Sequence, residues 1–136
     1  MIQGKHIVID ARIRPSSTGR YADRLLHYLQ SIDRVNNYTV ILSKDDDWEP
    51  TADNFTVKRV PYPQFSFNPI NEIGFALTLY MLRPDLVHFC MTQYPVLYFG
   101  NIVCTTHDTT MLDSTRSKDG NQWVHKIKEL GYRFLM

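Results

Sequence analysis

The sequence has few cysteines and no CxxC pair. Its two cysteines, Cys90 and Cys104, are too few to define a disulfide framework. Both fall at or near the ends of expected strands, where a free cysteine is ordinarily a small buried apolar side chain. A redox pair on neighbouring strands is the alternative, and no motif supports it.

Long apolar runs and a leader pattern are missing as well. No apolar segment approaches the roughly 20 residues that a membrane-spanning helix needs, and the N-terminus lacks a signal-peptide pattern. These absences favour a cytoplasmic protein. The formal net charge is only +1 and the basic residues are dispersed, so the composition gives no support to a nucleic-acid partner.

Two common phosphate-binding loops are also absent, the G-x-G-x-x-G fingerprint and the Walker loop. The sequence does have 136 residues with 43% hydrophobic content, which suffices for one modest core. The chain is too short for two ordinary domains. We therefore expect a single domain over residues 1–136.

Short apolar runs alternate along the chain with segments of helical periodicity. Five runs rich in Val, Ile and aromatic residues predict strands, and these lie at residues 6–10, 38–42, 55–60 and 84–89 and from residue 102. Helices are predicted at 19–33, at 69–82 and from about 122. Strands that alternate with helices favour an α/β fold with a Rossmann-like parallel sheet covered by helices on both faces.

The first two helices differ in pattern. In the first, an apolar stripe at helical spacing leaves polar residues, Gln30 among them, for the other side, and the stripe comprises Tyr21, Leu25, Tyr28, Leu29 and Ile32. The second helix is apolar on nearly every side, which predicts heavy burial.

Right-handed crossovers would bring the carboxyl ends of the first, fourth and fifth strands to one edge of the sheet. Ligands of such sheets bind outside those ends. Residues 10–19, 89–94 and 105–110 are expected to converge there. This edge is therefore the first place to look for a functional site.

His107 and Asp108 end the fifth predicted strand side by side. A histidine there can hydrogen-bond a sugar hydroxyl, carry a proton or bind a metal, and Asp108 can orient it or cap the next turn. A structural role for His107 stays open. A metal site that also uses His88 and Cys90 matches no tight ligand spacing, so no metal is expected.

The loop Ser16–Tyr21 joins the first strand to a helix N-terminus. Backbone N–H groups and the helix dipole attract phosphate or carboxylate at such a place, and Gly19 would let a ligand approach closely. The alternative is an ordinary helix start, capped by Ser16, Ser17 or Thr18, in which glycine serves the backbone alone.

The last residues form an amphipathic pattern in which Trp123, Ile127, Leu130 and Phe134 share a helical face. The sequence stops inside this pattern. We therefore expect the chain to be the front portion of a longer protein.

Four motifs, in order, resemble the N-terminal half of glycosyltransferases of family 4, which have the two-domain GT-B architecture. They are Ile7–Arg12, Gly19–Tyr21 with the Leu25–Leu26 pair that follows it, Pro84–Phe89 and Val103–Asp108. The last segment carries the His-Asp ending typical of that family. The resemblance covers nearly the whole chain.

The resemblance implies the acceptor-side domain of a retaining glycosyltransferase that uses a nucleotide sugar and no bound metal or other cofactor. His107 would then reach the sugar in the cleft, Asp108 would support that turn, and Gly19 and Arg20 would lie near the donor phosphates. Placed dipoles suit such a reaction, because charge builds on the departing diphosphate.

The acceptor would be a glycan or a lipid-linked glycoconjugate, and the resemblance suggests contacts from the 62–67 and 91–94 loops, with Phe65, Gln93 and Tyr94 as candidates. The family's C-terminal domain, which holds most of the donor, is not in this sequence. The chain alone is therefore expected to be inactive and to bind nucleotides weakly.

A non-catalytic Rossmann-like binding module or partner subunit is the alternative function. The first helix carries basic side chains on one side, namely Arg20, Arg24, His27 and Arg34. They suggest the inner face of a membrane as a further partner, through a peripheral contact. Asp23 and Asp33 interrupt this basic side, which favours a solvated helix.

Overall fold

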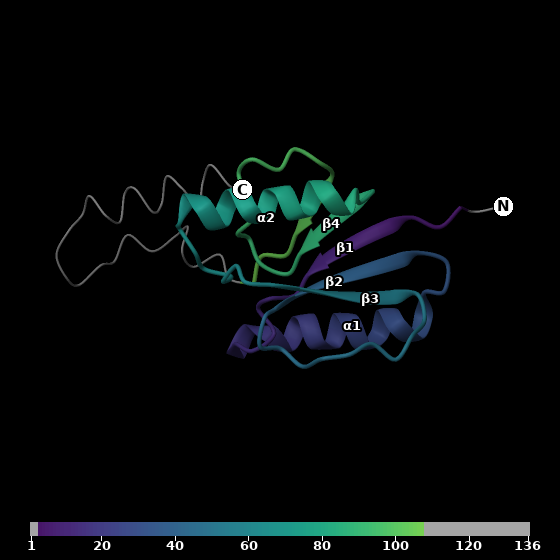
Figure 1. The fold of residues 1–136 in the computed structure, drawn as a ribbon. Coiled ribbons are helices and arrows are strands. Elements are labelled where there is room, and N and C mark those ends of the chain that lie inside the picture. Colours follow the sequence, from purple (N-terminus) through teal and green to yellow (C-terminus); the bar gives the residue numbers. More distant parts are fainter. Residues whose placement is uncertain (1–2, 108–136) are drawn as a thin grey trace.

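A five-stranded parallel sheet forms the centre of the fold, with a helix on each face (Figure 1). The computed structural model describes residues 3–107. The strands lie in the order β3-β2-β1-β4-β5, and every neighbouring pair is parallel. Their bounds are β1 His6–Asp10, β2 Asn37–Ser43, β3 Phe55–Val60, β4 Leu86–Phe89 and β5 Ile102–Cys104.

This order matches the first five positions of the doubly wound Rossmann arrangement, so the predicted fold class is confirmed. The strands β1 and β2 are continuous apolar runs rather than alternating ones, because both faces of a parallel sheet are covered. The predicted bounds of the first four strands and the start of the fifth agree with the structure to within two residues, but β5 ends at Cys104, before the position of His107 at which the fifth strand was expected to end.

Helix α1, Arg20–Ile32, follows a single 3₁₀ turn at Ser17–Gly19. Gly19 is its N-cap and makes no side-chain cap. The predicted capping by Ser16, Ser17 or Thr18 is therefore wrong for this helix. The Ser16 hydroxyl instead donates to the carbonyl of Ile13 at 2.8 Å, inside the preceding loop.

Helix α2, Pro69–Leu82, has the termini that the sequence predicted. The side-chain oxygen of Asn68 accepts a hydrogen bond from the N–H of Ile70 at 3.0 Å, and Pro69 occupies the first turn. At the other end Arg83 adopts a left-handed conformation (φ 48°), and Pro84 follows.

Two hydrophobic layers sandwich the sheet, and β1 contributes to both. Ile9 packs in the layer under α1 with Ala22 and Leu26. Val8 packs in the layer under α2 with Phe75 and Leu79. Successive strand residues point to opposite faces, so the central strand joins the two layers.

Burial on α1 differs from the predicted stripe. Ala22, Leu26 and Gln30 are the buried positions, whereas Tyr28 and Ile32 are exposed. Gln30 is not on the solvent side as predicted. Its side-chain oxygen accepts hydrogen bonds from the N–H groups of Thr51 and Ala52 at 2.7 and 3.2 Å, which anchors the loop between β2 and β3 against α1.

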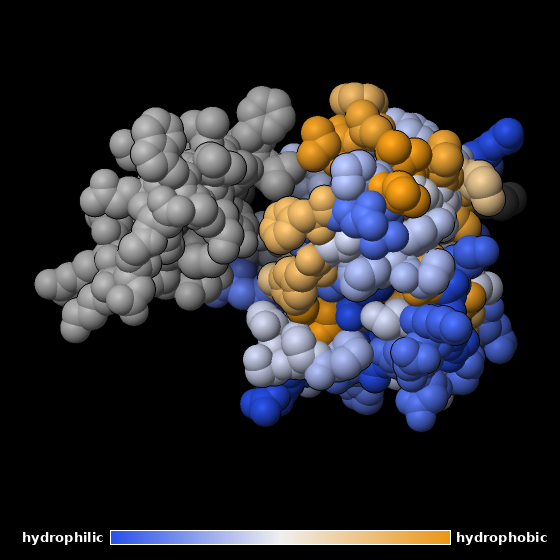
Figure 2. Space-filling model, turned by 60° about the vertical axis from the view of Figure 1, so that its left-hand side comes forward, coloured by the Kyte–Doolittle hydropathy of each residue, from blue (hydrophilic) through white to orange (hydrophobic). Residues whose placement is uncertain are grey.

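Burial on α2 also differs from the prediction. Phe75, Ala76 and Leu79 are buried, but Ile70 and Met81 on the other side are exposed. Apolar side chains therefore cover part of the molecular surface over this helix, as the orange region of Figure 2 shows.

Among residues 3–107, no helix is long and apolar enough to cross a membrane. Asp108 and the helix predicted from about residue 122 lie outside the described residues.

Candidate functional site

The carboxyl ends of β1 and β4 meet where the chain reverses its direction across the sheet. From β1 the chain passes through α1 to β2 on one side, and from β3 it passes through α2 to β4 on the other. Ligands of such folds bind outside the strands at this switch point, which we call the crevice. The loop after β1, the start of α1 and residues 105–107 after β5 lie at this edge of the sheet (Figure 1).

His107 is held over this edge by a backbone carbonyl and an aromatic ring. Its Nε2 lies 2.6 Å from the carbonyl oxygen of Cys90, which directly follows β4. Its ring meets the Tyr21 ring edge to face, with centroids 5.1 Å apart. A carbonyl oxygen only accepts, so Nε2 carries a proton, and Nδ1 of the neutral imidazole is then an acceptor.

Tyr21, Thr105 and His88 form a hydrogen-bonded chain beside His107. The Thr105 hydroxyl donates to the Tyr21 hydroxyl at 3.0 Å. The Thr105 oxygen also lies 2.9 Å from Nε2 of His88 and must therefore accept from it. This direction leaves the phenolic proton of Tyr21 at the end of the chain, where it can donate to a ligand.

His88 supports this chain from inside the fold. It is half-buried on β4, and burial lowers the pKa of its imidazole below the ordinary value. The ring therefore stays neutral near pH 7. A neutral His88 donates through Nε2 to Thr105, as the chain requires.

Gly19 lies at the N-terminus of α1 and is buried against the preceding loop. A Cβ atom at this position would come within 2.1 Å of the Arg14 carbonyl oxygen. This close approach requires glycine whether or not a ligand binds. Arg20 is exposed at the first position of α1, next to the crevice.

A buried ion pair fixes the start of the β1–α1 loop. The guanidinium of Arg12 makes two 2.8 Å hydrogen bonds to the carboxylate of Asp10, and both side chains are buried. Arg12 also donates to the carbonyl of Tyr62 at 3.1 Å and lies 3.7 Å from the centre of the Phe75 ring. The loops after β1 and β3 are thereby tied together.

The predicted acceptor-binding residues form a separate group on the α2 side of the sheet. Gln93 donates to the carbonyl of Ser66 at 3.3 Å, which joins the 91–94 loop to the 62–67 loop. The Tyr94 ring packs on Phe89, and Phe65 is exposed. Within residues 3–107, no hydrogen bond or ring contact joins this group to Tyr21 or His107.

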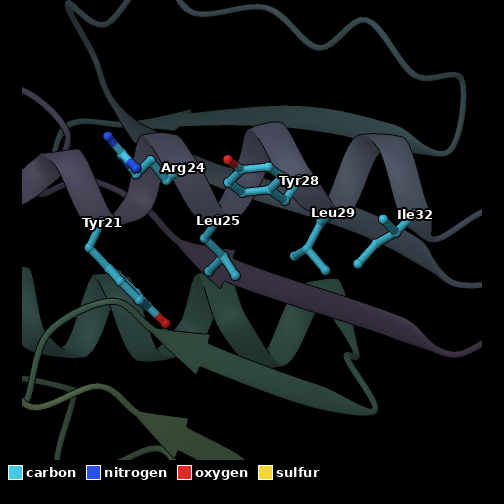
Figure 3. A pocket seen from close by; sticks show the side chains of 6 residues that line it. All are labelled: Tyr21, Arg24, Leu25, Tyr28, Leu29 and Ile32. Atoms are coloured by element: carbon cyan, nitrogen blue, oxygen red, sulfur yellow. The ribbon is translucent and has the colours of Figure 1, made fainter.

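An apolar groove runs along α1 from the crevice. It has a volume of about 320 Å³, and Tyr21, Arg24, Leu25, Tyr28, Leu29 and Ile32 line it (Figure 3). These residues include the apolar stripe that the sequence predicted to be the buried face of α1. Tyr21 belongs to both the groove and the hydrogen-bonded chain, so the two features are continuous.

Both cysteines are free thiols, as expected. Cys90 is buried, and burial, together with the nearby Asp10 carboxylate, raises the pKa of its thiol to about 12. Burial also raises the pKa of the half-buried Cys104 thiol. Among the residues that the structure describes, no three His, Cys, Asp or Glu side chains are grouped so that they could hold a metal ion.

The sequence singled out His107 as a candidate, but Tyr21 and Thr105 were not predicted to be its polar neighbours. Tyr21 was interpreted as part of an apolar stripe. Its position in the first turn of a helix that begins at the ligand edge was the available signal. Thr105 directly follows β5, and the parallel register that aligns Phe89 with Cys104 brings it beside His88.

Comparisons of the chain with family models, with curated proteins and with solved structures found no match. The class of the protein therefore follows from its own topology, which is an α/β fold with a Rossmann-like parallel sheet.

Proposed function

We propose that this chain is the acceptor-side domain of a retaining glycosyltransferase. The enzyme would transfer a sugar from a nucleotide sugar to a glycan or glycoconjugate acceptor. The observation that carries the proposal is the cluster of His107, Tyr21, Thr105 and His88 at the carboxyl edge of a Rossmann-like sheet. The motif resemblance names the reaction, and the cluster supplies groups that suit it.

The cluster offers a sugar both a donor and an acceptor. The Tyr21 hydroxyl ends a chain of donors, and Nδ1 of His107 accepts when the imidazole is neutral. Sugar hydroxyls both donate and accept, so such a pair can orient a sugar ring. The neighbouring ring edge and the Cys90 carbonyl restrict the rotation of His107, which lowers the entropic cost of binding.

Helix α1 would contribute to the donor side of the cleft. Its N-terminus lies at the same edge as His107, and the exposed Arg20 adds a positive charge there. The partial positive charge of a helix N-terminus and a guanidinium both stabilise negative charge on a diphosphate. The C-terminal domain of the resembling family would supply the remaining donor contacts.

Transfer from radiolabelled nucleotide sugars by the full-length natural protein tests the proposal. We expect His107→Ala to lower kcat/KM by at least about 100-fold, the usual cost of losing one placed polar group in such a site. His107→Gln should retain more activity, because an amide can still donate to the Cys90 carbonyl. His27→Ala is the matched control, since His27 is an exposed histidine on α1.

Undiminished transfer by His107→Ala would remove His107 from the mechanism. A wild-type protein that transfers no sugar from any common nucleotide sugar to glycan or lipid-linked acceptors would contradict the proposal itself.

A non-catalytic partner module is the second candidate, and the exposed apolar side of α2 favours it. The natural reading frame distinguishes the two candidates. A continuation beyond residue 136 into a second α/β domain, with two glutamates a few residues apart, supports the enzyme. A stop at residue 136 supports the partner module.

A further inference from the structure

Helix α2 has two apolar sides, and the sheet covers only one of them. Phe75 and Leu79 face the sheet and are buried. Ile70, Ile73 and Leu77 lie on the opposite side at a spacing of three and four residues, and all three are exposed. A helix that is apolar all round is normally buried all round.

The exposed apolar surface extends beyond the helix itself. We define the outer α2 face by six large side chains, Phe67, Ile70, Ile73, Leu77, Met81 and Phe99. Phe67 and Phe99 are 84% and 82% exposed, and Met81 is 75% exposed. Hydrophobic residues gather over this helix in the upper part of Figure 2.

The loop after β4 is fixed beside α2. The Tyr80 hydroxyl donates to the carbonyl of Leu97 at 2.9 Å and accepts from the N–H of Phe99 at 2.9 Å. Phe99 is therefore held next to the helix. Exposed apolar side chains on an ordered surface indicate an interface with another molecule.

We propose that the outer α2 face binds the same face of a second copy of this chain and forms a two-fold symmetric dimer. Aromatic side chains carry roughly 150–250 Å² each and the aliphatic ones less, so at these exposures the six present on the order of 700 Å². This is about the area that each partner buries in a standard protein interface.

The pattern along the helix suits self-association. Ile70, Ile73, Leu77 and Met81 repeat with the three- and four-residue spacing of a helix–helix seam. A two-fold axis would place this seam against its own copy, as an isologous interface requires. The sequence carries a formal net charge of only +1, so two copies repel each other little.

The charges around α2 fit a protein partner better than a lipid surface. Helices that lie on membranes carry Lys and Arg along their polar side. Within α2 the single charged residue is Glu72, which lies on the sheet side, where burial raises its pKa and the Arg12 guanidinium opposes part of that increase. Arg83 follows only at the C-cap.

Sedimentation equilibrium of the purified 136-residue chain, over a range of concentrations, tests the dimer. We expect a monomer–dimer equilibrium for the wild type. The double variant Ile70→Glu/Leu77→Glu should weaken the dimer at least about 100-fold, because two pairs of carboxylates would be buried face to face. Both positions are exposed in the monomer, and glutamate is a good helix former.

Ile32→Glu is the matched control, because Ile32 is 74% exposed on α1, on the other face of the sheet. It should dimerise like the wild type. Far-UV circular dichroism checks that all variants keep the fold. If the double variant loses its helical signal, the single variant Met81→Glu, at the end of the helix, replaces it.

Three results would overturn the proposal. The wild type could remain monomeric at about 100 µM, which is above the micromolar to picomolar dissociation constants of standard-size interfaces. Ile32→Glu could disrupt the dimer as strongly as the double variant. Co-sedimentation of the wild type, but not of the double variant, with phosphatidylcholine–phosphatidylglycerol vesicles would assign the face to lipid instead.

Discussion

Tyr21 connects two features that differ in polarity. Its ring lines the apolar groove along α1, and its hydroxyl ends the hydrogen-bonded chain from His88 through Thr105. The ring also holds His107 at the crevice. A phenol suits this boundary, because one end of the side chain is apolar and the other end can donate and accept hydrogen bonds.

His88 makes the stability of the fold depend on pH. An unfolded histidine has a pKa of about 6.5, and burial lowers the pKa of His88 in the folded protein. As the pH falls below about 6.5, the unfolded chain binds a proton before the folded one does, so the free energy of unfolding decreases. The decrease ends below the folded pKa.

We expect His88→Gln to reduce this acid sensitivity. Glutamine can donate to Thr105 but does not titrate. Urea unfolding at about pH 7.5 and about pH 5 gives the two free energies, and their difference should be smaller for His88→Gln than for the wild type. His27→Gln, at an exposed site, should keep the wild-type difference. If the free energy of unfolding changed equally between the two pH values in all three proteins, the lowered pKa of His88 would be contradicted.

At the scale of elements, the sequence predicted which helices and strands exist and where they begin better than it predicted which of their sides are buried. The two α-helices and five strands of residues 3–107 were all predicted, because β-branched runs and helical periodicity are local signals. Proline at both ends marks the bounds of α2, and in the structure the preceding Asn68 caps its start. Its exposure did not follow, since the sequence of one helix does not state which of its apolar sides meets the sheet.

The start of α1 shows the same limit. The sequence offered a hydroxyl cap as one alternative, whereas the chain closes a 3₁₀ turn and packs Gly19 against a carbonyl five residues earlier. This approach depends on the path of the whole loop. The candidate site was likewise predicted only in part, because Tyr21 and Thr105 are 84 residues apart and meet through the strand order.

Gly19→Ala should destabilise the protein. The added Cβ would lie 2.1 Å from the Arg14 carbonyl oxygen, and that backbone can move only if the loop moves. We expect a loss of about 1–3 kcal/mol, typical of an overpacked site. The backbone angle at Gly19 (φ −62°) is ordinary, so the effect would be steric.

Gly74→Ala is the comparison, measured by urea unfolding under the same conditions. A Cβ atom at Gly74 would come within 2.6 Å of the Tyr62 hydroxyl, which is the end of a movable side chain. Alanine also gains about 1 kcal/mol of helix propensity over glycine. The loss should therefore be smaller than at Gly19. A larger loss of stability for Gly74→Ala than for Gly19→Ala would show that the loop before α1 moves more easily than the Tyr62 side chain.

For the whole molecule, the sheet divides the core into two layers that share their central strand. Ile9 belongs to the layer under α1, and Val8 belongs to the layer under α2. The buried Asp10–Arg12 pair reinforces this link, since Arg12 reaches the loop that leads into α2. Loosening either layer should therefore destabilise β1.

We expect Leu26→Ala and Leu79→Ala each to lower the free energy of unfolding by about 2–5 kcal/mol, because both side chains are fully buried. They lie on opposite sides of the sheet, so their effects should add in the double variant.

Amide exchange should accelerate at both Val8 and Ile9 in each single variant, whichever layer carries the cavity. Ile32→Ala, at an exposed site, is the control and should change neither the free energy of unfolding nor the amide exchange of Val8 and Ile9. Faster exchange confined to the side of the substitution would mean that the two layers unfold separately.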